Sequence, residues 1–313
     1  MIKEVDILNT IENMKGGSSP GFDNITANML KSIKSHVIKP LTHLINLSLK
    51  NGIFLSNYKR TIISPIFKSG NAQNVTNYRP ISLISNIGKI FEKIVKSQLM
   101  EFIENNKILH DNQYGFRKAH STQDAIANVT SRIYKNLDMS KKCIGIFIDL
   151  RKAFDSISHK KLMKKLDNLN INENVANWIK SYIKNRPQCV KINNIYSDEE
   201  TSEYGIPQGT VLGPILFILY VNGIFSQSLH GSITSYADDT VLIESGITWQ
   251  VVKQKATEDI NILKHWFDIN LLSLNSEKTH VIPFAIKSND VLVNFDIIIH
   301  DNSKDHKKKI TVQ

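Results

Sequence analysis

Two short runs of β-forming residues flank a pair of acids in ITSYADDTVL, residues 233–242, and this pattern predicts a β-hairpin. Asp238 and Asp239 fall at its turn. Two ionised carboxylates a few ångströms apart repel by roughly 1 kcal/mol even in water, so one tends to take up a proton unless a cation lies between them. Asp is also common in hairpin turns, where its side chain bonds the local backbone, so the pair alone leaves a purely structural role open.

A second apolar segment ends on a third acid. CIGIFIDL, residues 143–150, is almost continuously apolar, as a buried strand is, and it delivers Asp149 at its end. If the two strands are neighbours in a sheet, Asp149 joins Asp238 and Asp239. Mg²⁺ prefers oxygen ligands and keeps positions open for water and substrate phosphates. Three such acids would suit two ions about 3.5 to 4 Å apart, an arrangement for in-line displacement at phosphorus.

Composition fits a globular chain with an anionic partner. The 313 residues are 41% hydrophobic, enough for a sizeable core, and the formal charge of +10 suggests nucleic acid or an anionic membrane surface. Cys143 and Cys189 have no metal-binding spacing and are expected to pack as small apolar residues in a reducing compartment. The start lacks a signal peptide, and the most apolar run, 211–221, is too short to cross a bilayer. We therefore expect an intracellular, soluble protein.

Hydrophobic periodicity predicts an α+β fold, with helices interleaved among strands and an antiparallel hairpin. The expected helices cover most of residues 1–40, interrupted at 16–24, and then 87–103, 162–169, 175–183, the stretch after 210, and 256–267. The expected strands cover 61–67, 143–150, 188–196, the hairpin, and a strand, turn and strand within 270–284. The last stretch, 300–313, is basic and is expected to be partly disordered.

Six ordered blocks carry a family resemblance. They are NYRPISL (77–83), QYGFR (113–117), FIDLRKAFD (147–155), YGIPQGT (204–210), YADD (236–239) and LNSEKT (274–279). With KGGSSPGFDNI at 15–25, they resemble the reverse transcriptase of non-LTR, LINE or jockey-like retrotransposons, over nearly the whole chain up to about residue 284. The resemblance implies an RNA-directed DNA polymerase that adds dNTPs to a primer 3′-hydroxyl by two-metal-ion catalysis. It implies Mg²⁺ as the cofactor, with Mn²⁺ as a substitute. The implied partners are an RNA template and a DNA primer, and no membrane is expected.

The resemblance also assigns roles to residues. Asp149 and Asp238 would be the principal metal ligands, and Asp239 would complete the set. Lys68 and Arg79 would contact the incoming triphosphate, for which an ammonium and a planar guanidinium are suited; a solvated loop is the alternative.

Other blocks imply contacts with the sugar, the nucleotide and the template. Phe154 would lie against the sugar and exclude a ribose 2′-hydroxyl, or else be a core aromatic. Gln208 and Gly209 would touch the incoming nucleotide, or else form a plain turn before a helix. Phe116 and Arg117 would contact the template strand by packing or stacking and by phosphate pairing.

The implied architecture is a right-hand polymerase with fingers and palm, an antiparallel palm sheet and a thumb that is largely missing. Residues 1–57 would lead into the fingers, 58–290 would form the reverse transcriptase domain, and 291–313 would be a basic tail truncated before the thumb. After Phe284 the family usually continues into an apolar hairpin and a helical thumb, which this sequence does not resemble. Copying at chromosomal DNA implies a visit to the nucleus. We therefore expect an intracellular protein, in the nucleus and in the cytoplasm.

Two alternatives to an active reverse transcriptase stay open. Truncation and positive charge would also suit a non-catalytic nucleic-acid-binding remnant, although the unbroken set Asp149, Asp238 and Asp239 favours an enzyme. An RNA-dependent RNA polymerase shares the palm and the acidic hairpin, and Asp155 is placed where such enzymes read the 2′-hydroxyl. Phe154 and the RPISL and GFR blocks favour DNA synthesis.

Overall fold

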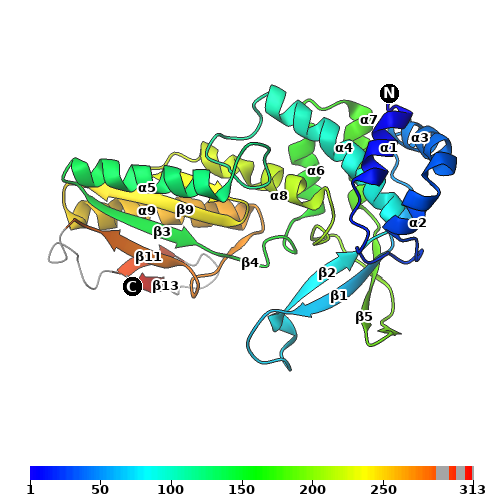
Figure 1. The fold of residues 1–313 in the computed structure, drawn as a ribbon. Coiled ribbons are helices and arrows are strands. Elements are labelled where there is room, and N and C mark those ends of the chain that lie inside the picture. The colour runs from blue at the N-terminus through cyan, green and yellow to red at the C-terminus, as the bar shows by residue number, and fades with distance from the viewer. Residues whose placement is uncertain (287–295, 301–306, 312–313) are drawn as a thin grey trace. The chain divides into compact units, whose positions relative to one another are not determined.

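The computed structural model describes residues 1–286, 296–300 and 307–311 and confirms an α+β fold. The chain divides into two compact units (Figure 1). One unit contains Met1–Ile108 and Ile157–Leu216, and the other contains Leu109–Ser156 and Phe217–Gln313. Within the described ranges no helix is long and apolar enough to span a membrane. Both cysteines are buried and free, as predicted.

Helices form most of the first unit. They are α1 (Glu4–Glu12), α2 (Ala27–Ser32), α3 (Lys34–Lys50), α4 (Asn86–Asn105), α6 (His159–Asp167) and α7 (Glu173–Ile183), and α8 (Gly213–Val221) runs on into the second unit. The long predicted helix is α4, whose N-terminus is capped by the Ser85 hydroxyl accepting from the Gly88 N–H. Phe54, Phe91 and Trp178 meet edge to face in the core of this unit. Truncating one such ring to Ala would cost about 3–5 kcal/mol.

A mixed sheet completes the first unit. Its strands are β1 (Thr61–Phe67), β2 (Tyr78–Leu83), β5 (Pro187–Ile192), β6 (Ile195–Tyr196) and β7 (Glu200–Thr201). β1 pairs antiparallel with β2 and parallel with β5. The strand predicted over 188–196 is confirmed as far as Ile192, but its continuation to 196 is wrong, because Asn193 and Asn194 both adopt positive φ (47° and 67°) and turn the chain back on itself. Asn tolerates positive φ better than most residues, so the Asn193-Asn194 pair in the sequence could have predicted a hairpin turn here.

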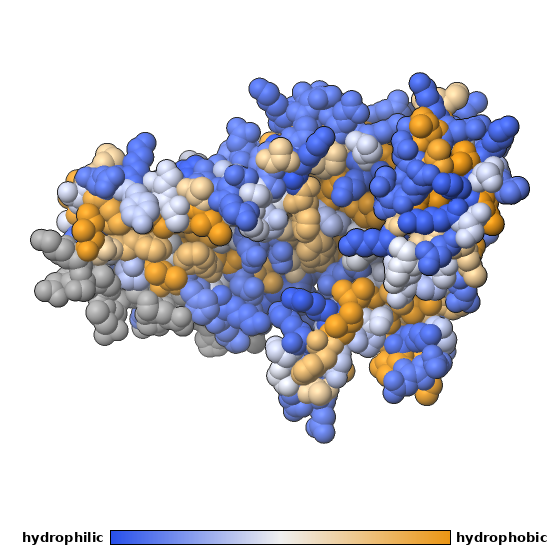
Figure 2. Space-filling model, viewed as in Figure 1, coloured by the Kyte–Doolittle hydropathy of each residue, from blue (hydrophilic) through white to orange (hydrophobic). Residues whose placement is uncertain are grey.

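The β1–β2 hairpin extends from this sheet and exposes apolar side chains. Ile66, Phe67 and Val75 are all exposed, and hydrophobic surface follows the hairpin in Figure 2. Short 3-10 helices occupy Ser56–Tyr58, the hairpin loop at Val75–Asn77, and, in the second unit, Asn222–Ser226. β1 was predicted, whereas β2 was not.

The second unit is built on a four-stranded antiparallel sheet in the order β11-β3-β9-β8. These strands are β3 (Lys142–Ile148), β8 (Ser232–Tyr236), β9 (Asp239–Gly246) and β11 (His280–Phe284). The pairing of β8 with β9 is the predicted hairpin. β4 (Leu150–Arg151) and β10 (Ser273–Leu274) form a separate small pair.

Helices α5 (Thr122–Asp138) and α9 (Trp249–Ile269) both pack on this sheet (Figure 1). Successive side chains of a strand point to opposite faces. Cys143 and Ile243 therefore face α5, where they cluster with Ile133. α9 was predicted; α5 was not, although Ser121 and Asp124 form a capping box at its start.

The chain after Phe284 differs from the predicted basic tail. β12 (Asp296–His300) and β13 (Lys307–Thr311) pair as an antiparallel ladder, and β12 packs on α9. Strand pairing supplies the backbone partners that a disordered tail lacks, so within the stretch 300–313 that was expected to be partly disordered, His300 and Lys307–Thr311 are ordered. The rest of the predicted tail lies outside the described residues.

Candidate active site

Strand register brings Asp149 next to Asp239. The β3–β9 ladder ends with Ile148 opposite Thr240. In an antiparallel pair, the residue after Ile148 faces the residue before Thr240, so Asp149 follows the end of β3 just where Asp239 begins β9. The two strands are neighbours, as the sequence predicted.

The third acid occupies the turn of the β8–β9 hairpin. Tyr236 pairs with Asp239, which leaves Ala237 and Asp238 as a two-residue loop. Ala237 has φ of 60°, a left-handed conformation that is uncommon for a residue with a Cβ and that costs energy unless neighbouring contacts hold it. Asp238 and Asp239 are both exposed at this end of the sheet.

The carboxylates influence one another electrostatically. The pKa of Asp239 is raised above its usual value, first by partial burial and then by the negative charges of Asp238 and Asp149. A bound cation would relieve this repulsion, and oxygen-only donors suit Mg²⁺. Across the part of the chain that the structure describes, no three His, Cys, Asp or Glu side chains form a ready metal site. The acids are therefore close enough to repel, without enclosing a cation position.

Asn275 and Thr279 hold Asp149 in place. The Asn275 side-chain amide donates to Asp149 Oδ2 at 2.8 Å, and its backbone N–H donates to the Asp149 carbonyl at 2.8 Å. The Asp149 N–H reaches Thr279 Oγ1 at 3.4 Å. No role was assigned to either of these two polar residues from the sequence. The sequence signal that could have pointed to Asn275 and Thr279 is the LNSEKT block, which contains both residues.

Phe154 stacks on Phe217, with ring centroids 4.5 Å apart and planes at 19°. Phe217 is fully buried, whereas Phe154 is half-buried. The contact fixes the Phe154 ring from one side, which is compatible with both the sugar-facing and the core role.

Phe116 and Arg117 lie in the loop before α5. Phe116 is exposed and has φ of 59°, a strained conformation for an aromatic residue. The Arg117 guanidinium donates to the carbonyl oxygens of His110 and Gln113, at 3.0 and 3.1 Å. This arginine braces its own loop, and its contact with a template stays a prediction.

The remaining predicted residues lie in the first unit. Ile66 pairs with Arg79 across β1 and β2, and Lys68 follows Ile66 by two residues. Because side chains alternate along a strand, Lys68 and Arg79 are on the same face of the hairpin. Both are exposed.

Gln208 and Gly209 are held against β2. The Ser82 N–H donates to the Gln208 carbonyl at 2.7 Å. Gly209 has φ of 94°, and an added Cβ would lie 3.4 Å from the Ser82 carbonyl oxygen, so a side chain here would be strained. This loop and the strand that carries Arg79 are thus tied together inside one unit.

A buried acid fixes the helix that follows this loop. Glu92 of α4 accepts the backbone N–H groups of Val211 and Leu212 at 2.6 and 3.1 Å, just ahead of α8. These are the donors that a helix leaves free at its N-terminus. Burial raises the pKa of Glu92, and the Arg186 charge and the two backbone donors oppose that rise. Sequence reasoning missed Glu92, although an acid inside an apolar stripe was visible.

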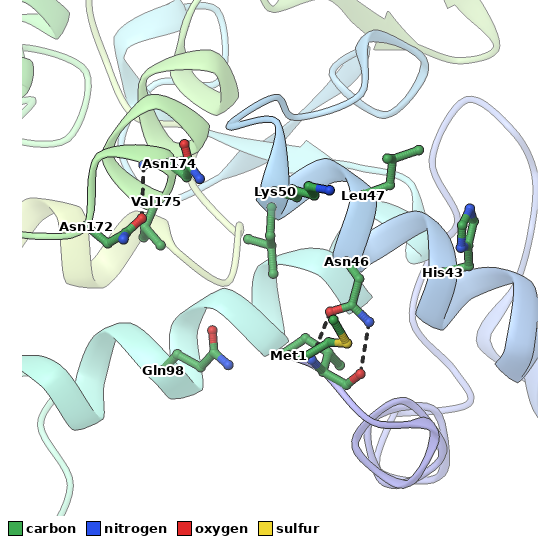
Figure 3. A pocket seen from close by; sticks show the side chains of 11 residues that line it. Met1, His43, Asn46, Leu47, Lys50, Gln98, Asn172, Asn174 and Val175 are labelled. Atoms are coloured by element: carbon green, nitrogen blue, oxygen red, sulfur yellow. Dashed lines mark hydrogen bonds between the residues drawn. The ribbon is translucent and has the colours of Figure 1, made fainter.

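An open hollow of about 480 Å³ also lies in the first unit (Figure 3). The Asn46 side chain on its wall accepts from the Ile2 N–H at 2.8 Å and donates to the Ile2 carbonyl at 2.9 Å. Another wall amide, Asn172, accepts from the Asn174 N–H. These amides serve the local backbone, and the residues that line the hollow include none of the predicted site residues.

The predicted residues therefore form two groups. Asp149, Asp238 and Asp239 gather in the second unit, which also holds Phe154, Phe116 and Arg117, and the first unit holds Lys68, Arg79, Gln208 and Gly209. An antiparallel sheet packed by helices, with three acids gathered at one end, defines an α+β protein with a candidate acidic site.

Comparison with known proteins identifies the family. The reverse transcriptase (RNA-dependent DNA polymerase) family matches residues 66–307, and the chain belongs to this family of nucleotidyltransferase enzymes. Within it the chain is jockey-like, of the non-LTR retrotransposon type.

Three of the similar proteins come from mobile elements of Drosophila melanogaster. The "Probable RNA-directed DNA polymerase from transposon BS" is 29% identical over 92% of this chain, and that of the X-element is 28% identical over 90%. The RNA-directed DNA polymerase from mobile element jockey is 25% identical over 90%. The matched part is 32%, 32% and 31% of these relatives, so the chain spans about a third of their length.

Proposed function

We propose that this chain is the polymerase part of a jockey-like element's protein, which extends a DNA primer along an RNA template by adding dNTPs. The observation that carries the proposal is the β3–β9 register, because it sets Asp149 beside Asp239, with Asp238 in the adjoining turn. Acids distant in the sequence gain nothing structural from converging, since their like charges repel. Their convergence is explained if they share a cation.

Asp149, Asp238 and Asp239 would hold two Mg²⁺ ions; the chemistry of their oxygen donors suits that role, although the described side chains do not by themselves enclose a cation position. Burial raises the pKa of Asp239, and the negative charges of Asp238 and Asp149 add to that rise; a cation would relieve the part that comes from these charges. Bound Mg²⁺ would lower the pKa of the primer 3′-hydroxyl and neutralise charge on the triphosphate. Asn275 would keep the Asp149 carboxylate oriented both with and without bound Mg²⁺.

Residues of the first unit would bind the incoming nucleotide. Lys68 and Arg79, exposed on one face of the β1–β2 hairpin, supply donors suited to triphosphate oxygens. Gln208 and Gly209 would contact the nucleotide, where the missing side chain of Gly209 permits close approach. We assign this unit to the fingers.

Residues of the second unit would choose the sugar and hold the template. The Phe154 ring, fixed against Phe217, would occupy the space of a ribose 2′-hydroxyl. Phe116 would stack on a template base, and Arg117 would contact a template phosphate. We assign the four-stranded sheet of this unit to the palm. Work in the nucleus, with passage through the cytoplasm, accords with copying at chromosomal DNA.

The direct test is extension of a labelled DNA primer on an RNA template, with Mg²⁺ and dNTPs. The wild-type chain should extend the primer, and Asp238→Asn should lose at least about 10³-fold in rate, since a metal ligand contributes several kcal/mol to the transition state. Asp198→Asn, at an exposed acid of the first unit, is the matched control and should match wild type.

The same assay separates the alternatives. Salt-sensitive binding of primer–template without extension by wild type would identify a non-catalytic remnant. Equal use of ribonucleotides, unchanged by Phe154→Ala, would contradict DNA synthesis and favour an RNA polymerase.

A further inference from the structure

The segment 113–115 lies along the free edge of the sheet beside the acidic turn. Gln113 forms an isolated parallel bridge with Ser235 of β8. The Tyr114 N–H donates to the Ser235 carbonyl at 2.8 Å, and the Ser235 N–H donates to the Asn112 carbonyl at 2.9 Å. The segment therefore adds a short length of strand to β8, directly before the turn that carries Asp238.

The side chain of Gln113 reaches the turn itself. Gln113 is completely buried, and its Oε1 accepts the Ala237 N–H at 3.1 Å and the Gly115 N–H at 2.9 Å. Ala237 is the residue of the two-residue loop with positive φ. A side-chain acceptor on its N–H thus stabilises the strained conformation that directs Asp238.

Close approach of the segment depends on Gly115. A Cβ added there would lie 2.1 Å from the Ala237 nitrogen and 2.8 Å from its Cα, far inside van der Waals contact. Arg117 holds the same loop from behind through the carbonyls of His110 and Gln113. Gln113 and Gly115 of QYGFR therefore lie against one peptide group of the acidic turn, and Arg117 supports the loop that carries them.

We propose that Gln113 is a positioning residue: its amide oxygen fixes the Ala237 peptide and so sets the direction of Asp238 relative to Asp239 and Asp149. It touches neither substrate nor metal. The inference rests on the proposed function only in assigning a catalytic role to the acidic turn. The hydrogen bond from Ala237 to Gln113 and its effect on the acids can be measured in an inactive protein.

The test compares Gln113→Met, which keeps the length of the side chain and removes the acceptor, with Gln113→Glu, which keeps an acceptor oxygen. Gln123→Met, at an exposed glutamine of α5, is the matched control. Hydrogen exchange of the Ala237 amide is measured in metal-free protein, and Mn²⁺ affinity is measured by electron paramagnetic resonance. Primer extension then gives kcat and the KM for dNTP.

For Gln113→Met we expect exchange at Ala237 to rise at least about tenfold and Mn²⁺ affinity to fall about tenfold, with kcat reduced about 10- to 100-fold and the KM for dNTP unchanged. Gln113→Glu should retain the protection of the Ala237 amide. If Gln113→Met does not fold, Gly115→Ala carries the test, because it displaces the segment while leaving the Gln113 side chain intact.

Wild-type exchange and wild-type Mn²⁺ affinity in a folded Gln113→Met would overturn the positioning role. An inactive wild type with normal exchange behaviour would instead count against the proposed function alone, since the exchange measurement needs neither substrate nor turnover.

Discussion

Strand β9 carries one acid from each of two acidic groups, and the surroundings of these groups differ. At its first residue, Asp239 is exposed and lies near Asp149 and Asp238, and no hydrogen bond joins these three acids among the described contacts. Five residues later, Glu244 is almost fully buried beside Asp259 of α9, whose carboxylate accepts the His230 and Gly231 N–H groups at 3.1 and 2.9 Å.

Burial determines how each group can be neutralised. Burial and the neighbouring Asp259 raise the pKa of Glu244 to about 9, so a proton neutralises this group at pH 7. The exposed acids can instead be reached by a cation. The comparison indicates that the inner group, Glu244 and Asp259, serves stability. The outer group, Asp149, Asp238 and Asp239, is available for chemistry. Four predictions test this distinction, from the largest expected effect to the smallest.

Replacing one carboxyl by an amide in each group should separate their roles. Asp149→Asn should lower primer extension by about 10³-fold or more with little change in Tm. Glu244→Gln should leave extension within a few-fold of wild type, since Gln resembles the protonated Glu. Rates and thermal melts of the two variants measure this, and a comparable loss of activity in both would end the distinction.

Loss of Asn275, which holds Asp149, should reduce activity less than loss of Asp149 itself. Asn275→Ala removes the amide that donates to Asp149 Oδ2, and partners of this kind typically contribute about 10- to 100-fold in activity. We expect kcat to fall by that factor while the KM for dNTP stays unchanged. Asn168→Ala, at an exposed asparagine, is the control, and parity between the two variants would remove Asn275 from the site.

Stability should fall with rising pH because of Glu244. Its folded pKa lies above its usual value of 4.5, so the folded state binds a proton that the unfolded state releases. The stabilisation is complete below pH 4.5 and is lost as the pH rises through about 9. We expect a loss on the order of 1–3 kcal/mol across this window, measured by urea unfolding at several pH values. Glu244→Gln should flatten the profile, whereas Glu277→Gln, at an exposed acid, should leave the slope in place.

The smallest effect concerns the repulsion among the outer acids. The pKa of Asp239 is also raised, so in metal-free buffer at pH 7 its charge opposes folding, and this cost disappears as the pH falls below its folded pKa. Asp239→Asn should therefore raise Tm by about 1 °C in the presence of a chelator. Addition of Mg²⁺ should raise the Tm of wild type and not that of Asp239→Asn; equal responses would argue against a cation at these acids.

Local chemistry made some elements predictable. The apolar run 143–150, the alternating segments around Asp238, and the periodicity of 87–103 each specify a strand or a helix by themselves, and all formed. The fold class and the family followed from such patterns and from the ordered blocks. The helix α5 was missed, and a strand was assigned across Asn193 and Asn194, where paired positive φ values made a turn.

The sequence by itself determined which acids, which strands and which family to expect, because hydrophobic period and motif order are written along the chain. Only the tertiary structure decided that Asn275 holds Asp149 and that Gln113 and Glu92 hold the backbone next to other predicted residues, since each acts on a peptide or a carboxylate more than a hundred positions away. It also decided that Glu244 differs from Asp239, because burial belongs to the packed sheet and not to either residue. Hydrogen bonds and desolvation between distant segments exist only once the chain has folded, which is why they could not be predicted from the motifs.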